Sequence, residues 1–263
     1  MKIKDVISTL ERFAPLPLQM DFDNAGLQVG TTEADVSGVL LCLEATEQQV
    51  SEAVEKGCNM IVTHHPLLFH GLKRISDTDY VQRTTIAAIR AGITIVSMHT
   101  NLDAAEGGVN YEIAKQMGLD MKSIELIEPQ TVDGVKGGEG IVGNFKEPLA
   151  AENFMQMLKQ EFRVPYVKAN ELLKRPIKRV AICGGGGSFL LPKAIEHKAD
   201  AFLTGEMKYN EFFDHEQEIQ IAVIGHYESE QYTQHLLQRI INNGCPEVKT
   251  YITEYLTNPI RYY

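Results

Sequence analysis

The chain alternates short apolar runs with longer amphipathic segments, which indicates strands that alternate with helices. Residues 3–13 form the first amphipathic segment, with Val6 and Leu10 on its apolar face and Pro15 just beyond its end. Apolar, β-branched runs follow, and each one leads into a segment of helical period. The expected strands are 36–43, 60–63 and 93–98, and the expected helices are 46–56, 80–90 and 106–117.

The same alternation returns in the second part of the chain, after a glycine-rich interruption. Residues 120–148 hold several glycines between short strand-like pieces, which predicts a hairpin or a linker. The strands expected beyond it are 179–183, 201–204, 219–224 and 248–252, and the helices are 149–161, 189–197, 210–216 and 227–243. Such alternation favours parallel β-α-β units. We therefore expect an α/β fold of two similar halves, residues 1–125 and 126–263.

The composition is that of a globular protein, and its charge narrows the range of partners. Hydrophobic residues make up 44% of the 263 residues, and the formal net charge is −10. This acidity disfavours binding to nucleic acid and to anionic membranes. We interpret the basic stretch 168–179 as a solvated connector in preference to a phosphate-binding patch. The N-terminal stretch lacks the unbroken apolar run of a signal peptide or membrane anchor, and the cysteines form no Cys-x-x-Cys pair. These features favour a cytoplasmic protein.

The histidines are the most informative residues of the sequence. His64, His65, His99 and His226 each stand within a residue or two of the carboxyl end of an expected strand. In open α/β sheets this edge is where ligands bind, because loops and helix N-termini converge there. The remaining histidines fall in a loop or on expected helices among charged residues, so we expect them to be ordinary surface residues.

Carboxylates follow two of these histidines in the sequence. Asp103 lies four residues after His99, and Glu230 lies four residues after His226 on an expected helix, where both side chains share one face. Imidazole and carboxylate donors suit zinc, iron, manganese or cobalt. Because five or six such donors exceed the needs of one tetrahedral ion, the pattern predicts two divalent metal ions per chain.

Each of these residues also has a simpler structural explanation. Asp103 could cap the helix expected at 106–117, His99 could be a core histidine bonded to a backbone carbonyl, and Glu230 could form a solvated pair with the histidine before it. Their joint placement at one sheet edge is what favours metal. The glycine run 184–187 has two interpretations that the sequence does not separate. It could form a tight strand-to-helix turn, or it could bind an anion such as phosphate.

Three motifs together resemble the Nif-three-like family, whose members are also named type 2 homologues of GTP cyclohydrolase I. The motifs are Thr63-His64-His65-Pro66, His99-Thr100-Asn101-Leu102-Asp103 and Gly225-His226-Tyr227-Glu228-Ser229-Glu230. Further matches lie at residues 23–30, 183–188 and 200–206, so the resemblance covers essentially the whole chain.

The resemblance implies a two-domain α/β fold with a dinuclear metal centre in the cleft between the halves. It places His64, Asp103 and Glu230 on one ion and His65, His226 and Glu230 on the other, so that Glu230 bridges the two. It also implies ring-shaped homohexamers. Longer relatives carry an extra domain inserted mid-chain, where this chain has only the short segment 120–148.

A metal-dependent hydrolase that acts on a nucleotide or a related small molecule is the leading hypothesis, and GTP cyclohydrolase-like activity is the version that the resemblance implies. His99 and Glu206 are the candidates for proton transfer or substrate contact. The alternative is a non-catalytic metal-binding or regulatory interaction protein, because metal ligands alone define neither a nucleophile nor a substrate pocket.

Overall fold

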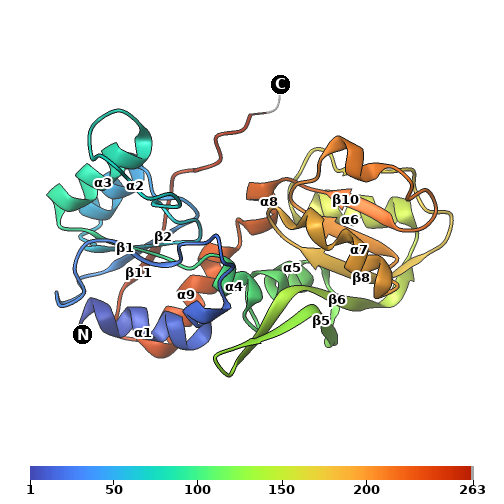
Figure 1. Cartoon of the computed structure of the whole chain (residues 1–263), viewed down its shortest axis with the longest axis horizontal. Coiled ribbons are helices and arrows are strands. Elements are labelled where there is room, and N and C mark those ends of the chain that lie inside the picture. Colours follow the sequence, from blue (N-terminus) through green and yellow to red (C-terminus); the bar gives the residue numbers. More distant parts are fainter. Residues whose placement is uncertain (262–263) are drawn as a thin grey trace. The chain divides into compact units, whose positions relative to one another are not determined.

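The computed structural model describes residues 1–261, and its chain divides into two compact units (Figure 1). The first unit holds residues 1–102 together with the segment that begins at Thr233, and the second holds residues 103–232. Contacts therefore group the chain differently from the expected halves 1–125 and 126–263. The last strand returns to pair with the first unit's sheet, which places the C-terminal segment in that unit.

The first unit is built on a five-stranded sheet in the order β1-β4-β3-β2-β11. Strands β2 (Val39–Cys42), β3 (Met60–Thr63), β4 (Thr94–Ser97) and β11 (Thr250–Ile252) run parallel, and β1 (Gly26–Val29) pairs with β4 in the antiparallel sense. All residues of β2, β3 and β4 are buried, as expected for continuous apolar runs in a parallel sheet. The predicted strands are confirmed, but β1 was not predicted.

Capping residues mark the ends of two helices in the first unit. The helical elements of this unit are α1 (Ile3–Phe13), the 3-10 turn η1 (Leu16–Leu18), α2 (Glu47–Glu55), α3 (Tyr80–Ala91) and α9 (Thr233–Gly244). Thr46 and Asp79 accept hydrogen bonds from the first turns of α2 and α3. Gly92 ends α3 in the left-handed conformation, with φ of 65°.

The second unit is built on a six-stranded sheet in the order β5-β6-β8-β9-β10-β7. Strands β8 (Ile177–Cys183), β9 (Ala201–Thr204) and β10 (Gln220–Val223) are parallel, and β7 (Lys168–Ala169) pairs antiparallel with β10. The glycine-rich interruption forms a long hairpin of β5 (Asp120–Val132) and β6 (Val135–Leu149), the paired arrows labelled in Figure 1. Each unit thus contains three consecutive parallel strands, and the expected mixed α/β class is confirmed.

The helices outside the first unit depart more from prediction. The first, α4 (Thr100–Ala104), crosses the sequence boundary between the two units. The others are the helices α5 (Val109–Met117), α6 (Ala151–Glu161), α7 (Leu191–Glu196) and α8 (His226–Glu230). Two 3-10 turns, η2 (Gly187–Leu190) and η3 (Tyr209–Phe212), complete the set. The helix predicted at 210–216 is wrong, since only η3 forms there. The long helix predicted at 227–243 is broken, because α8 ends at Glu230 and α9 begins at Thr233.

The cysteines agree with the sequence prediction. Cys42, Cys58, Cys183 and Cys245 are all buried and none forms a disulfide within residues 1–261. Over the same residues no helix combines the length and the apolar character needed to cross a bilayer.

Candidate metal centre

Three histidines gather at the carboxyl edge of the first unit's sheet. Strands β3 and β4 are parallel and in register, with Thr63 opposite Ser97, so the residues that follow them leave the sheet side by side. The ring centroids of His64 and His65 are 4.9 Å apart, and the ring of His99 lies 5.4 Å from the first and 5.5 Å from the second. The expectation that functional residues follow the carboxyl ends of parallel strands therefore identified a cluster of imidazoles.

His64 and His65 each use one ring nitrogen for a structural hydrogen bond. The Nδ1 of His64 lies 2.8 Å from the carbonyl oxygen of Met98, and the Nδ1 of His65 lies 2.9 Å from the carboxylate of Glu44. An oxygen at Nδ1 favours the tautomer that carries its proton there, which places the lone pair on Nε2. His64 is fully buried, so this orientation is fixed by packing as well.

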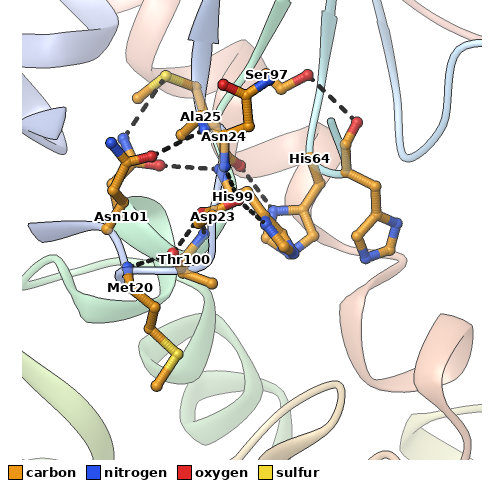
Figure 2. Close-up of polar contacts among 12 residues, drawn as sticks. Met20, Asp23, Asn24, Ala25, His64, Ser97, His99, Thr100 and Asn101 are labelled. Atoms are coloured by element: carbon orange, nitrogen blue, oxygen red, sulfur yellow. Dashed lines mark hydrogen bonds and ion pairs between the residues drawn. The ribbon is translucent and has the colours of Figure 1, made fainter. Parts of the chain in front are cut away.

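His99 is held in the same way by a carboxylate that lies far from it in the sequence. The Nδ1 of His99 lies 2.7 Å from Oδ1 of Asp23, whose other oxygen accepts hydrogen bonds from the backbone and hydroxyl of Thr100 (Figure 2). The side chain of Asn101 accepts from the backbone N–H of His99 and donates to the carbonyl of Ala14. The alternative that His99 is a core histidine bonded to a carbonyl is therefore wrong.

Asp23 is strongly acidic in this setting. Burial alone would raise its pKa, but the hydrogen bonds from His99 and Thr100 lower the pKa of Asp23 to about 2. Its carboxylate thus stays charged and orients the imidazole of His99 through Nδ1. The sequence did not reveal that Asp23 positions this histidine.

An aromatic pair stands beside this cluster in the first unit. The ring of Phe69 meets His99 edge-on at 6.1 Å and also contacts Phe22 at 6.2 Å. Phe22 is 61% exposed, which is unusual for a phenylalanine. The histidine cluster is thus bordered by an apolar surface on which a flat substrate ring could lie.

The second unit gathers its candidate residues at the equivalent edge of its own sheet. Strands β8, β9 and β10 are parallel and in register, with Cys183 opposite Thr204 and Thr204 opposite Val223. The glycine turn, Glu206 and His226 therefore follow neighbouring strands. The backbone N–H of Glu206 donates to the carbonyl of Gly185 at 2.9 Å, which ties two of these segments together.

His226 stands between two carboxylates within this unit. Its Nδ1 lies 3.2 Å from Oε1 of Glu206, and its Nε2 lies 3.2 Å from Oε2 of Glu230. The side chain of Glu206 is 61% exposed and that of Glu230 only 5%. His226 therefore follows the pattern of the first unit, with an oxygen at Nδ1 and the Nε2 directed at a candidate metal ligand.

The glycine turn lets Glu230 approach the sheet edge closely. A Cβ on Gly185 would meet Oε1 of Glu230 at 2.3 Å, and the φ of 54° at Gly185 is itself unfavourable for other residues. Ser229 fixes the helix turn that carries Glu230, because its hydroxyl accepts from the backbone N–H of Gly185 and donates to the carbonyl of His226. The sequence did not identify Ser229 as a positioning residue.

Asp103 belongs to the second unit and is tied to the glycine turn by Asn110. The amide of Asn110 donates to the backbone carbonyl of Asp103 and accepts from the backbone N–H of Gly184. Asp103 lies in α4, and the residue that caps α5 is Gly108. The alternative that Asp103 caps the helix expected at 106–117 is therefore wrong.

The carboxylates of the second unit raise the pKa values of two further groups in it. Burial, and then the charge of Asp103, raise the pKa of Glu139 to about 7. Burial also raises the pKa of the Cys183 thiol well above its usual value, and the charges of Glu139, Asp103 and Glu230 add to this effect. Negative charge is thus concentrated around Cys183, an arrangement in which a bound cation relieves repulsion.

Comparison with known proteins places this arrangement in a family. Residues 1–259 match the family described as Duf34/NIF3 (NGG1p interacting factor 3). The chain belongs to the Duf34/NIF3 family. It is 32% identical over 266 residues to the GTP cyclohydrolase 1 type 2 homolog of Lactococcus lactis, covering 98% of each chain. It is 31% identical over 229 residues to NGG1-interacting factor 3 of Saccharomyces cerevisiae, covering 80% of this chain and 79% of the relative.

A solved structure of this family shares the fold of the chain. The crystal structure of Staphylococcus aureus protein SA1388 matches with a TM-score of 0.90 and 27% sequence identity, covering 100% of this chain and 99% of that one. The resemblance that the histidine and glutamate motifs indicated is therefore confirmed, and the Duf34/NIF3 fold accounts for both sheets.

Proposed function

We propose that this Duf34/NIF3 protein holds two divalent metal ions and uses them to hydrolyse a nucleotide or a related small molecule. The proposed ligands are His64 and His65 from the first unit and Asp103, His226 and Glu230 from the second. Glu230 is proposed to bridge the two ions. Zinc, iron, manganese and cobalt all suit such a mixed imidazole and carboxylate set.

The observation that carries the metal proposal is the shared orientation of the imidazoles. His64, His65 and His226 each have an oxygen at hydrogen-bonding distance from Nδ1, or close to it, at 2.8, 2.9 and 3.2 Å. Histidines that bind metal nearly always donate their second ring nitrogen to a carbonyl or carboxylate, which fixes the tautomer and the direction of the donor. His215 makes the same contact with Glu218 in the turn before β10, so the proposal rests on this orientation together with the strand-end positions of the three histidines.

The chemistry of the donor set also supports the proposal. His64 and His65 lie side by side in the first unit and offer two imidazole donors of the kind that bind a metal ion. The carboxylates of the second unit lie close to other negative charges. Burial raises the pKa of Glu139, and the charge of Asp103 raises it further. Metal ions bound there would lower the pKa of water and polarise a carbonyl, imine or phosphoryl oxygen.

We assign proton transfer or substrate contact to His99. Asp23 holds its Nδ1 at 2.7 Å, and Phe69 packs edge-on against the ring, so its Nε2 has a fixed direction. Glu206 contacts Nδ1 of His226, and this contact supports a role in orienting that ligand beside any contact with substrate. The nucleotide class of substrate is suggested by the name of the Lactococcus lactis relative and by the exposed aromatic pair Phe22 and Phe69.

A turnover screen tests the hydrolase proposal. The metal-loaded protein is incubated with GTP and other nucleoside triphosphates, and products are followed by chromatography in the wild type, His99→Gln and His235→Gln. We expect metal-dependent product in the wild type and in the His235→Gln control, whose histidine is exposed on α9, and strong loss in His99→Gln with its metal retained. Absence of product from every nucleotide would refute the hydrolase proposal.

A non-catalytic interaction role is the second candidate function. The observation that favours it is the name of the yeast relative, NGG1-interacting factor 3, which describes an interaction and no reaction. In this role the metal ions would stabilise a binding surface. The same screen separates the two candidates, because the interaction role predicts full metal content without turnover.

A further inference from the structure

An open pocket of about 420 Å³ lies within the second unit, at the carboxyl edge of its parallel strands. It is lined by Lys168, Gly186, Ser188, Glu206, Met207 and Lys208. Each lining segment follows or flanks a strand end: Lys168 pairs with Val223, the last residue of β10, and the glycine turn follows β8. The pocket therefore occupies the position at which α/β sheets bind their ligands.

The lining is basic, in contrast to the chain as a whole. The lining holds two lysines, Lys168 and Lys208, and one carboxylate, that of Glu206, which lies beside Nδ1 of His226. Neither lysine forms a side-chain ion pair within residues 1–261. On a protein of net charge −10, two unneutralised lysines in one pocket indicate an anionic ligand.

The glycine turn and a carboxylate beneath the lining complete the pocket. A Cβ added to Gly186 would meet no atom within 4 Å, so the backbone of the turn is open to the pocket at this residue. Glu211 accepts hydrogen bonds from the hydroxyl of Ser188 and from the backbone N–H of Lys208, at 3.2 and 2.6 Å. This carboxylate joins two lining segments and so holds the pocket in shape.

The geometry points to a binding site for the phosphate groups of a substrate between Lys168, Lys208 and the glycine turn. Lysine ammonium groups and exposed backbone of glycine-rich turns are common phosphate-binding elements. The volume of about 420 Å³ suits a di- or triphosphate better than a single small anion. This inference rests on the proposed function, since it names the class of molecule on which the metal centre acts.

Glu206 links the pocket to the proposed metal ligand. It lines the pocket and contacts His226, so a phosphate chain held by the lysines would lie one side chain away from that histidine. The lysines would hold the non-reacting phosphates while the reacting part of the substrate extends toward the metal ligands. Binding energy from such a remote group orients the reacting centre.

Calorimetric titration of the intact, metal-loaded protein with inorganic pyrophosphate tests the site. We expect pyrophosphate to bind, and Lys168→Ala and Lys208→Ala each to weaken the Kd about tenfold, as loss of one charge-assisted hydrogen bond implies. Lys146→Ala, which removes an exposed lysine of β6, is the control and should leave the Kd unchanged. All variants should keep the metal content of the wild type.

The outcomes separate this inference from the metal proposal. If the wild type is loaded with metal but pyrophosphate does not bind, or binds with the same Kd in both lysine variants, the phosphate site is wrong and the metal centre stands. Pyrophosphate binding that is lost on chelation of the metal but not in the lysine variants would also show that the phosphate site is wrong. If pyrophosphate binding depends on the lysines in a protein that takes up no metal, the site stands and the proposed function falls.

Discussion

Asp23 and His99 meet at 2.7 Å between Oδ1 and Nδ1, although 76 residues separate them in the sequence. The carboxylate is buried and charged, and its second oxygen is held by Thr100. This pairing fixes the tautomer and direction of an imidazole that stands next to two other histidines. It supports the proposed role of His99 in proton transfer or substrate contact.

Replacement of Asp23 by Asn should reduce stability in a pH-dependent manner. Because the folded protein lowers the pKa of Asp23 from 3.8 to about 2, its charge stabilises the fold above the unfolded pKa and loses this effect as pH falls toward the folded value. We expect the variant to lose about 1–2 kcal/mol at pH 7. Urea unfolding at pH 7 and pH 2.5 measures this. A difference between the proteins that does not shrink at the lower pH would contradict the assignment.

Replacement of Gly185 by Ala should displace the carboxylate of Glu230. The new Cβ would lie 2.3 Å from Oε1 of Glu230, and the φ of 54° adds a backbone cost of about 1–2 kcal/mol. We expect a lower Tm and a lower metal content. Gly186→Ala is the matched control, since its Cβ would meet no atom within 4 Å. Equal metal contents in the two variants would show that the close approach of Glu230 is unimportant.

Replacement of Glu139 by Gln should stabilise the metal-free protein at alkaline pH. Burial and the charge of Asp103 raise the pKa of Glu139 from 4.5 to about 7, so its ionisation costs stability as pH rises from the lower value through the higher one. We expect a gain on the order of 2 kcal/mol at pH 8 and almost none at pH 4. Urea unfolding of the two metal-free proteins at both pH values tests this, and a pH-independent difference would rule it out.

The sequence predicts most of the strands and the histidine cluster because both follow from short-range pattern. Residues 60–63 are apolar and β-branched, so β3 was predicted with its observed bounds, and the rule for strand ends then located His64 and His65. The hairpin of β5 and β6 was only partly recognised because its glycines mimic loop residues. Gly138 is needed in a strand, since a Cβ there would meet the backbone of Glu128 at 2.6 Å.

The features that the sequence did not reveal depend on long-range contacts. Asp23 gives no local sign of its pairing with His99, and Asn110 gives none of its bonds to Asp103 and Gly184. The break between α8 and α9 was likewise hidden, because residues on both sides keep a helical period. Periodicity reports which face of an element is buried but not which partner covers it.

Elemental analysis of anaerobically purified protein tests the central claim most directly. It compares the wild type with Glu230→Ala and with Glu228→Ala, a control on the same helix whose carboxylate folds back toward Gly225. We predict about two transition-metal ions per chain in the wild type and in Glu228→Ala, and a sharp fall in Glu230→Ala, because a bridging carboxylate serves both ions. A wild type that takes up no transition metal, or a Glu230→Ala variant that retains its full content, would contradict the account.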